Sequence, residues 1–254
     1  MTDILRLDKL VRNFGGLMAV YNISMQINPG ERRAIIGPNG AGKTTLFNLI
    51  SGELPAVSGR VYLDGHDVTE RAAYERANLG IGRTFQRTNL FFELSVFENV
   101  RLAVQHRQRV SRRFFSPASS FSAVNEETVH LLEQIGLAAR QDEPVKALAY
   151  GQQRALEMAL ALANRPKVLL LDEPTAGMSP AETNDMVDLI SRLPRELTIL
   201  IIEHDMDVIF SLADKISVLH YGQIIAEGTP PEIKNNKQVQ EIYLGQDAGG
   251  TFLS

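Results

Sequence analysis

The chain has 254 residues, 44% of them hydrophobic and 22% charged, so it is long enough to bury a large core. Its formal net charge of −4 argues against a sequence-independent nucleic-acid binder, which needs a strongly basic chain. The lack of cysteine excludes disulfides, thiolate metal sites and cysteine nucleophiles. Apolar stretches are too short to span a bilayer and the N-terminus does not resemble a signal peptide, so we expect a cytoplasmic chain.

The first 65 or so residues are predicted to be rich in β-strands, because apolar and polar side chains alternate along them or form short apolar runs. The predicted strands are residues 4–10, 20–27 and 32–37, and the segment 60–68 is predicted to be a strand that leads into a turn at Asp64-Gly65. A helix is expected over 43–51, which Gly52 terminates.

Residues 95–165 show helical patterns instead. Ser95 and Glu98 form an S-x-x-E capping box at the start of one helix, and a second helix is expected from near Asn125. The segment 151–164 is apolar nearly all round, which predicts a deeply buried helix.

From residue 168 onward, apolar strands alternate with helices. The expected strands are 168–172, 198–202, 215–220 and 224–228, with helices from Pro180 and Asp205. This alternation implies a parallel sheet that is covered on both faces. The whole pattern therefore predicts one α/β core interrupted by a helical insertion.

The segment GPNGAGKTT matches G-x-x-x-x-G-K-[ST] between a predicted strand and a predicted helix. Its glycines let backbone N–H groups surround phosphates, and the helix N-terminus adds its positive end. Lys43 would reach the β- and γ-phosphates, and the Thr44 hydroxyl would ligate Mg²⁺. A chance glycine-rich turn is the competing interpretation, which the complete motif in this context disfavours. The predicted nucleotide-binding residues here are Gly37, Pro38, Asn39, Gly40, Ala41, Gly42, Lys43, Thr44 and Thr45.

Two consecutive carboxylates, Asp172 and Glu173, follow the apolar run VLLL. They emerge at the carboxyl end of a predicted strand, where open α/β sheets bind ligands. Asp172 suits Mg²⁺, and Glu173 suits a general base that activates water. Alone, the pair would be read as a solvated strand end, but with the phosphate loop it predicts nucleotide hydrolysis.

With these motifs in this order, the chain resembles the ATP-binding subunit of an ATP-binding cassette (ABC) transporter over nearly its whole length. The resemblance implies an α/β fold of the P-loop NTPase (RecA-like) type, with a parallel-sheet core, an N-terminal antiparallel β subdomain and an inserted α-helical subdomain. Within a single domain, 1–254, residues 1–86 and 166–254 would form the catalytic core and 87–165 the helical signature subdomain. ATP and Mg²⁺ are the implied cofactors, and ATP hydrolysis coupled to transport is the implied activity.

The resemblance also implies roles for residues outside these two motifs. Gln86 in GRTFQ matches a glutamine that contacts Mg²⁺ and reports the γ-phosphate state, and His204 in IIEHD matches a switch histidine that contacts the γ-phosphate. Phe14 matches an aromatic residue that stacks on adenine, although it could simply belong to the core. The signature motif, which would contact the ATP of a partner subunit, is represented by Ala149, Tyr150, Gly151 and Gln152.

Two positions depart from the family pattern. Ala149 stands where the signature usually has a serine, so the hydroxyl contact with the partner's γ-phosphate must be replaced or lost. Gly151 and the helix N-terminus can still offer backbone N–H groups. Ser179 stands where an aspartate is usual, and with Pro180 and Glu182 it is predicted to cap the next helix.

The segments FGGLMAVYNIS, RTFQRTNLFFELSVFENV and EGTPPEI…EIYLG resemble one branch, the longer of the two paired ATPases of branched-chain amino acid importers. ATPases of urea or amide importers, those of lipopolysaccharide-type exporters and soluble ABC ATPases stay open as alternatives. A phosphoryl-transferring kinase would leave His204 and the signature motif without a role. The implied partners are a second ATP-binding subunit, head to tail, as homo- or heterodimer, integral membrane permease subunits and a solute-binding protein, with no nucleic acid. The implied place is the inner face of the plasma membrane, as a peripheral subunit.

Two further segments each allow two interpretations. The basic segment 107–113 could meet anionic lipid headgroups or be a solvated surface loop. Residues 87–94 could receive a cytoplasmic helix of the membrane subunit, or Leu90 and Phe91 could pack in the core.

Overall fold

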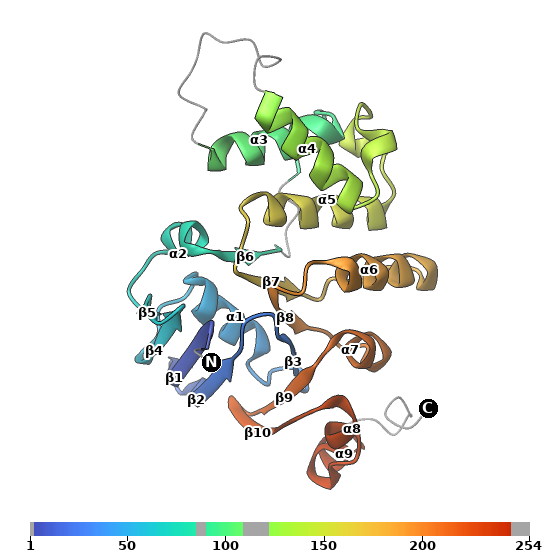
Figure 1. Ribbon diagram of the computed structural model, residues 1–254. Helices are drawn as coiled ribbons and strands as arrows, with labels where there is room; N and C mark the ends of the chain where they lie inside the picture. The colour runs from blue at the N-terminus through green and yellow to red at the C-terminus, as the bar shows by residue number, and fades with distance from the viewer. Residues whose placement is uncertain (1–2, 85–89, 109–121, 245–254) are drawn as a thin grey trace. The chain divides into compact units, whose positions relative to one another are not determined.

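The computed structural model describes residues 3–84, 90–108 and 122–244 (Figure 1). The chain divides into two compact units. The first unit comprises Met1–Arg83, Lys167–Glu173 and Leu193–Ser254, and the second comprises Thr84–Pro166 and Pro174–Arg192. Within the described residues, no helix is both long and apolar enough to cross a membrane.

The first unit contains an antiparallel sheet with the strand order β2-β1-β4-β5. Its strands are β1 (Leu5–Phe14), β2 (Leu17–Ile27), β4 (Ser58–Leu63) and β5 (His66–Asp67). The alternating apolar residues point into the core, as Leu5, Leu7 and Leu10 show by being at most 1% exposed. The predicted turn at Asp64-Gly65 is present, and both residues have a positive φ, which suits a tight hairpin.

The second sheet of this unit has the order β10-β9-β3-β8-β7-β6. Its strands are β3 (Arg32–Ile36), β6 (Ile81–Arg83), β7 (Val168–Asp172), β8 (Thr198–Ile202), β9 (Lys215–His220) and β10 (Gln223–Gly228). Five of these strands run parallel, and β10 pairs antiparallel with β9 at the edge. Every residue of the three central strands is buried, which confirms the predicted parallel sheet.

Helices cover both faces of the parallel sheet. On one side, α1 (Lys43–Ser51) shares a core with the antiparallel sheet, and Gly52 ends this helix in the left-handed conformation, as expected. On the other side, side chains of β3 and β9 pack with α7 (Met206–Leu212) and with α8 (Pro230–Lys234) and α9 (Lys237–Leu244). The sequence analysis did not predict α8, α9 or the short helix α2 (Ala73–Leu79).

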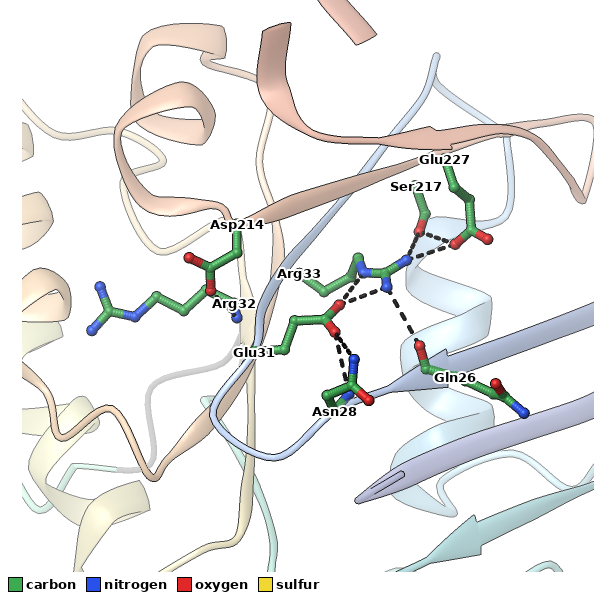
Figure 2. A network of polar contacts seen from close by, with 8 residues as sticks. All are labelled: Gln26, Asn28, Glu31, Arg32, Arg33, Asp214, Ser217 and Glu227. Carbon is green, nitrogen blue, oxygen red and sulfur yellow. Dashed lines mark hydrogen bonds and ion pairs between the residues drawn. The ribbon is translucent and has the colours of Figure 1, made fainter. Parts of the chain in front are cut away.

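A buried arginine joins strands of both sheets (Figure 2). Arg33 on β3 is paired with Glu31 through Nε at 2.6 Å and with Glu227 of β10 through Nη1 at 2.6 Å. It also donates to Ser217 Oγ at 2.9 Å and to the carbonyl oxygen of Gln26 at 3.4 Å. These bonds anchor β3, the strand that leads into the glycine-rich loop.

The second unit is helical, with α3 (Val96–Arg107), α4 (Ser122–Gln134), α5 (Tyr150–Ala163) and α6 (Pro180–Arg192). The predicted capping box at the start of α3 is confirmed. The Ser95 N–H donates to Glu98 Oε2 at 3.0 Å, and the Glu98 N–H donates to Ser95 Oγ at 3.1 Å. The second half of α5 is buried over most of its residues, as its apolar pattern predicted.

Candidate nucleotide site

The glycine-rich loop lies between β3 and α1 and follows a path that only glycine can take at two points. Gly37 and Gly42 have φ values of 152° and 102°. A Cβ on either residue would lie 2.1 Å from a backbone carbonyl oxygen, that of Leu219 or that of Ala19. Gly42 is also the N-cap of α1 and has no side chain to cap the helix, so this N-terminus is left to favour an anion.

Lys43 lies against this loop. Its Nζ donates to the carbonyl oxygens of Gly37 at 2.6 Å and Pro38 at 3.1 Å. Burial lowers the pKa of Lys43, while the nearby carboxylates of Glu173 and Asp172 raise it. The two hydrogen bonds hold the ammonium group beside the glycine-rich loop. A phosphate bound there would compensate the partial desolvation of this charge.

Asp172 ends β7 and forms a buried ion pair with Arg83, the last residue of β6. Arg83 Nη2 lies 2.9 Å from Asp172 Oδ2, and the side chains are 8% and 0% exposed. Among the described residues, the other carboxylate oxygen, Oδ1, is buried without a hydrogen-bond partner. Burial raises the pKa of Asp172, and Arg83 opposes that rise. The sequence analysis missed Arg83, whose only signal was a charge at the end of the short run IGR.

Glu173 and His204, both predicted as catalytic residues, share a hydrogen bond. Glu173 Oε1 lies 2.7 Å from His204 Nε2. Glu173 has a φ of 49°, a left-handed conformation that costs a non-glycine residue about 1–3 kcal/mol. The His204 N–H donates to Glu203 Oε2 at 2.8 Å, which fixes the backbone just after β8. Because β7 and β8 are neighbours in the sheet, their carboxyl ends bring the acid and the histidine together.

The outcome differs among the remaining predicted residues. Phe14 is 45% exposed at the end of β1, with the Arg12 guanidinium 4.9 Å from its ring centre, so the alternative that it belongs to the core is wrong. Gln86 lies outside the described residues, as do 87–89 and all but the start of the basic segment. In the second unit, Leu90 is buried, as the core interpretation expected, whereas Phe91 is 60% exposed.

The signature residues form the N-terminus of α5. Ala149 is the N-cap, and its N–H donates to the side-chain Oε1 of Gln152 at 3.1 Å. The Tyr150 hydroxyl donates to the carbonyl oxygen of Ala176 at 3.3 Å, in the segment before α6. The signature motif is thus attached to that segment within the helical unit.

Ser179 and Glu182 cap α6, as the sequence analysis predicted. Glu182 Oε2 accepts from the Ser179 N–H at 3.0 Å and from its hydroxyl at 2.8 Å. Glu182 Oε1 also accepts a hydrogen bond from the N–H of Gly151 at 3.0 Å, a bond that sequence reasoning missed. One of the signature N–H groups expected to be available is therefore already engaged.

A strand, a glycine-rich loop and a helix, with a lysine in the loop and carboxylates at a neighbouring strand end, define a phosphate-loop nucleotide-binding protein. Such a site binds the phosphates of a nucleotide such as ATP or ADP.

Comparison of the sequence with known proteins identifies the family of this chain. Residues 20–176 match the ABC transporter family, and residues 223–249 match a family described as branched-chain amino acid ATP-binding cassette transporter. The chain is 39% identical, over 96% of its length and 98% of the relative's, to the high-affinity branched-chain amino acid transport ATP-binding protein BraF of Pseudomonas aeruginosa. LivG of Escherichia coli K12, a protein of the same description, has the same identity and coverage.

Solved structures agree. The ADP conformation of MJ1267, an ATP-binding cassette of an ABC transporter, is 32% identical with a TM-score of 0.84, covering 96% of this chain and 100% of that one. A nucleotide-free ATP-binding cassette from an ABC transporter is 34% identical with a TM-score of 0.81, covering 95% and 99%. This chain therefore belongs to the ABC transporter family, as an ATP-binding subunit and ABC ATPase. The predicted P-loop fold, with its antiparallel β subdomain and parallel core, is confirmed.

Proposed function

We propose that this chain is the ATP-hydrolysing motor subunit of an importer for branched-chain amino acids. The identity to BraF and LivG and the C-terminal match at 223–249 support this substrate class over urea, amides or lipopolysaccharide. The chain would act on the inner face of the plasma membrane with permease subunits and a solute-binding protein. Those partners would select the solute, while this chain supplies nucleotide chemistry.

The observation that carries the hydrolytic role is the 2.7 Å contact between Glu173 and His204. Glu173 takes the proton of the attacking water, a contribution of about 10²–10⁴-fold for a general base. His204 holds the Glu173 carboxylate and contacts the γ-phosphate. Lys43, whose ammonium group lies at the loop, binds the β- and γ-phosphates.

The residues present fit a Mg²⁺ ion that arrives with ATP. Asp172 Oδ1 is a buried carboxylate oxygen without a partner among the described residues, and oxygen is the ligand that Mg²⁺ prefers. Within the described chain there is no group of three or more His, Asp or Glu that could hold a metal ion, and the phosphate oxygens of ATP would supply further ligands. Asp172 and the Thr44 hydroxyl would hold the ion, with Gln86 as a further ligand. When bound, Mg²⁺ neutralises charge on the phosphates.

The motor works as a head-to-tail pair of ATP-binding subunits. Each ATP lies between residues 37–45 of one subunit and 149–152 of the other, and Phe14 stacks on the adenine. ATP binding favours the closed pair, and hydrolysis removes that preference, which is a shift between two conformational states. The exposure of Phe14 supports its role, because a core ring could not stack on a ligand.

The test compares wild type with Glu173→Gln by size-exclusion chromatography with MgATP and by phosphate release. We expect Glu173→Gln to lose at least about 10²-fold in turnover and to pair only with ATP. A variant that loses turnover but stays monomeric indicates an obligatory heterodimer, which adding the sister subunit then tests. Retained turnover contradicts the role of Glu173.

The substrate class is tested in proteoliposomes that contain the chain with its copurified permease subunits. ATP-dependent uptake of leucine, isoleucine and valine is expected, with urea and short-chain amides as controls. Uptake of a control solute in their place contradicts branched-chain amino acid import and leaves the hydrolytic role standing.

A further inference from the structure

Three helices that begin with a serine or threonine are capped by a glutamate in the same way, but one of these glutamates has a second contact. Glu98 at α3, Glu182 at α6 and Glu232 at α8 accept the N–H of the residue at the cap at 3.0, 3.0 and 2.7 Å. Only Glu182, of these three, has a hydrogen bond from another helix, the 3.0 Å bond from the Gly151 N–H of α5. The carboxylate therefore bridges the signature motif and the start of α6.

The contact is close and charged. A Cβ at Gly151 would lie 3.0 Å from both Cγ and Oε1 of Glu182, so glycine at this position is what admits the carboxylate. The hydrogen bonds from Ser179 and Gly151 lower the pKa of Glu182, so the group is a full anion at neutral pH.

This anion occupies the place where another anion is expected. In the proposed pair, the γ-phosphate of the partner's ATP approaches the N-terminus of α5. Ala149 has no hydroxyl to receive it, so backbone N–H groups must do so. The Gly151 N–H points at Glu182 Oε1, and a carboxylate and a phosphate repel each other at one helix N-terminus.

We propose that Glu182 is a positioning residue of the signature motif that holds the Gly151 N–H in the unpaired chain and yields it to the γ-phosphate of the partner's ATP on pairing. The inference rests on the proposed function. Two oxygens make the exchange possible, because Oε2 keeps the Ser179 cap while Oε1 releases Gly151. Glu182 and Gly151 also line a cavity of about 440 Å³ between α5, α6 and the end of α4, which gives the carboxylate room to turn.

The Glu182 carboxylate is therefore expected to raise the ATP concentration that is needed for pairing. Replacing Glu182 by glutamine removes the charge and leaves a single amide oxygen, which can accept from the Ser179 cap or from Gly151, whereas the carboxylate serves each with its own oxygen. The γ-phosphate then displaces a neutral group in place of an anion. Pairing is expected at a lower ATP concentration, even though the cap of α6 is weakened.

The experiment measures the MgATP concentration for half-maximal pairing, by analytical ultracentrifugation, with Glu173→Gln as the parent so that ATP is not consumed. If the parent pairs only with its sister ATP-binding subunit, that subunit is present throughout. Adding Glu182→Gln is expected to lower this concentration by roughly three- to tenfold. Adding Glu98→Gln, the matched cap variant of α3 in the same unit, is expected to leave it unchanged. Thermal melting of the Glu182→Gln and Glu98→Gln variants checks that the two substitutions lower the melting temperature by similar amounts.

Glu182→Asp provides a second variant if the glutamine fails to fold. It keeps the charge but shortens the side chain, so the carboxylate withdraws from Gly151, and pairing is expected to shift in the same direction by less. An unchanged or higher ATP requirement in both Glu182 variants overturns the inference. If the parent itself never pairs with ATP, the proposed function fails, and this inference fails with it.

Discussion

Replacing Arg83 by methionine tests how much the buried ion pair at the end of β7 contributes to the stability of the folded chain. The substitution keeps much of the aliphatic side chain and removes the guanidinium. It breaks the 2.9 Å contact with Asp172 and the 2.6 Å hydrogen bond to Asn48 Oδ1. Asp172 would then remain in a site where its side chain is 0% exposed, with no counter-charge from Arg83.

The magnitude follows from that burial. Removing one partner of a buried ion pair costs about 3–5 kcal/mol, because an uncompensated charge is left behind. This is a large share of the roughly 5–15 kcal/mol that stabilises a typical protein. The loss also depends on pH. Burial already raises the pKa of Asp172, and without Arg83 the pKa rises further.

The sign of the pH dependence follows from proton binding. A carboxyl group whose pKa is higher in the folded state binds its proton more tightly there, so its contribution favours folding at low pH and is lost as pH rises through the folded pKa. The gap in stability between wild type and Arg83→Met is therefore expected to be larger at pH 8 than at pH 5.

The assay is urea denaturation followed by far-ultraviolet circular dichroism, since the chain has no tryptophan to report unfolding. Arg60→Met is the matched control, because Arg60 pairs with Asp67 at 3.4 Å with side chains 63% and 40% exposed, and it is expected to change little. The double variant Arg83→Met/Asp172→Asn should recover most of the loss, as it removes the orphaned charge. Equal losses for Arg83→Met and Arg60→Met, or a gap that shrinks at pH 8, would refute this reasoning.

Two further predictions concern the site and the scaffold beneath it. His204→Ala is expected to lower phosphate release by roughly 10²-fold because it frees the Glu173 carboxylate, while the melting temperature hardly moves, since the His204 side chain is 47% exposed. Unchanged phosphate release would remove His204 from the hydrolytic machinery. Glu31→Gln should lower stability by about 1.5–3 kcal/mol, and Glu227→Gln by clearly less. Both carboxylates contact Arg33 at 2.6 Å, but their side chains are 7% and 41% exposed (Figure 2), so equal denaturation midpoints would contradict the argument.

Local patterns in the sequence were enough for the secondary structure that builds the site. The segment GPNGAGKTT has glycine at positions where φ is positive. Strand β7 consists of four apolar residues followed by Asp172, which is typical of a strand buried on both faces. The caps at Ser95 and Ser179 were readable for the same reason, since each is a contact within one helical turn. Short elements such as α2 and α8 gave no periodic signal of sufficient length and were missed.

The amino-acid sequence was therefore sufficient to predict the phosphate loop, the carboxylates after β7 and the family that they indicate. The partners of these groups could be seen only in the folded chain. Arg83 meets Asp172 across 89 positions, His204 meets Glu173 across 31, and Glu182 meets Gly151 across 31. Local sequence patterns cannot predict such contacts. The order of the strands in the sheet and the packing of α5 against α6 bring these residues together.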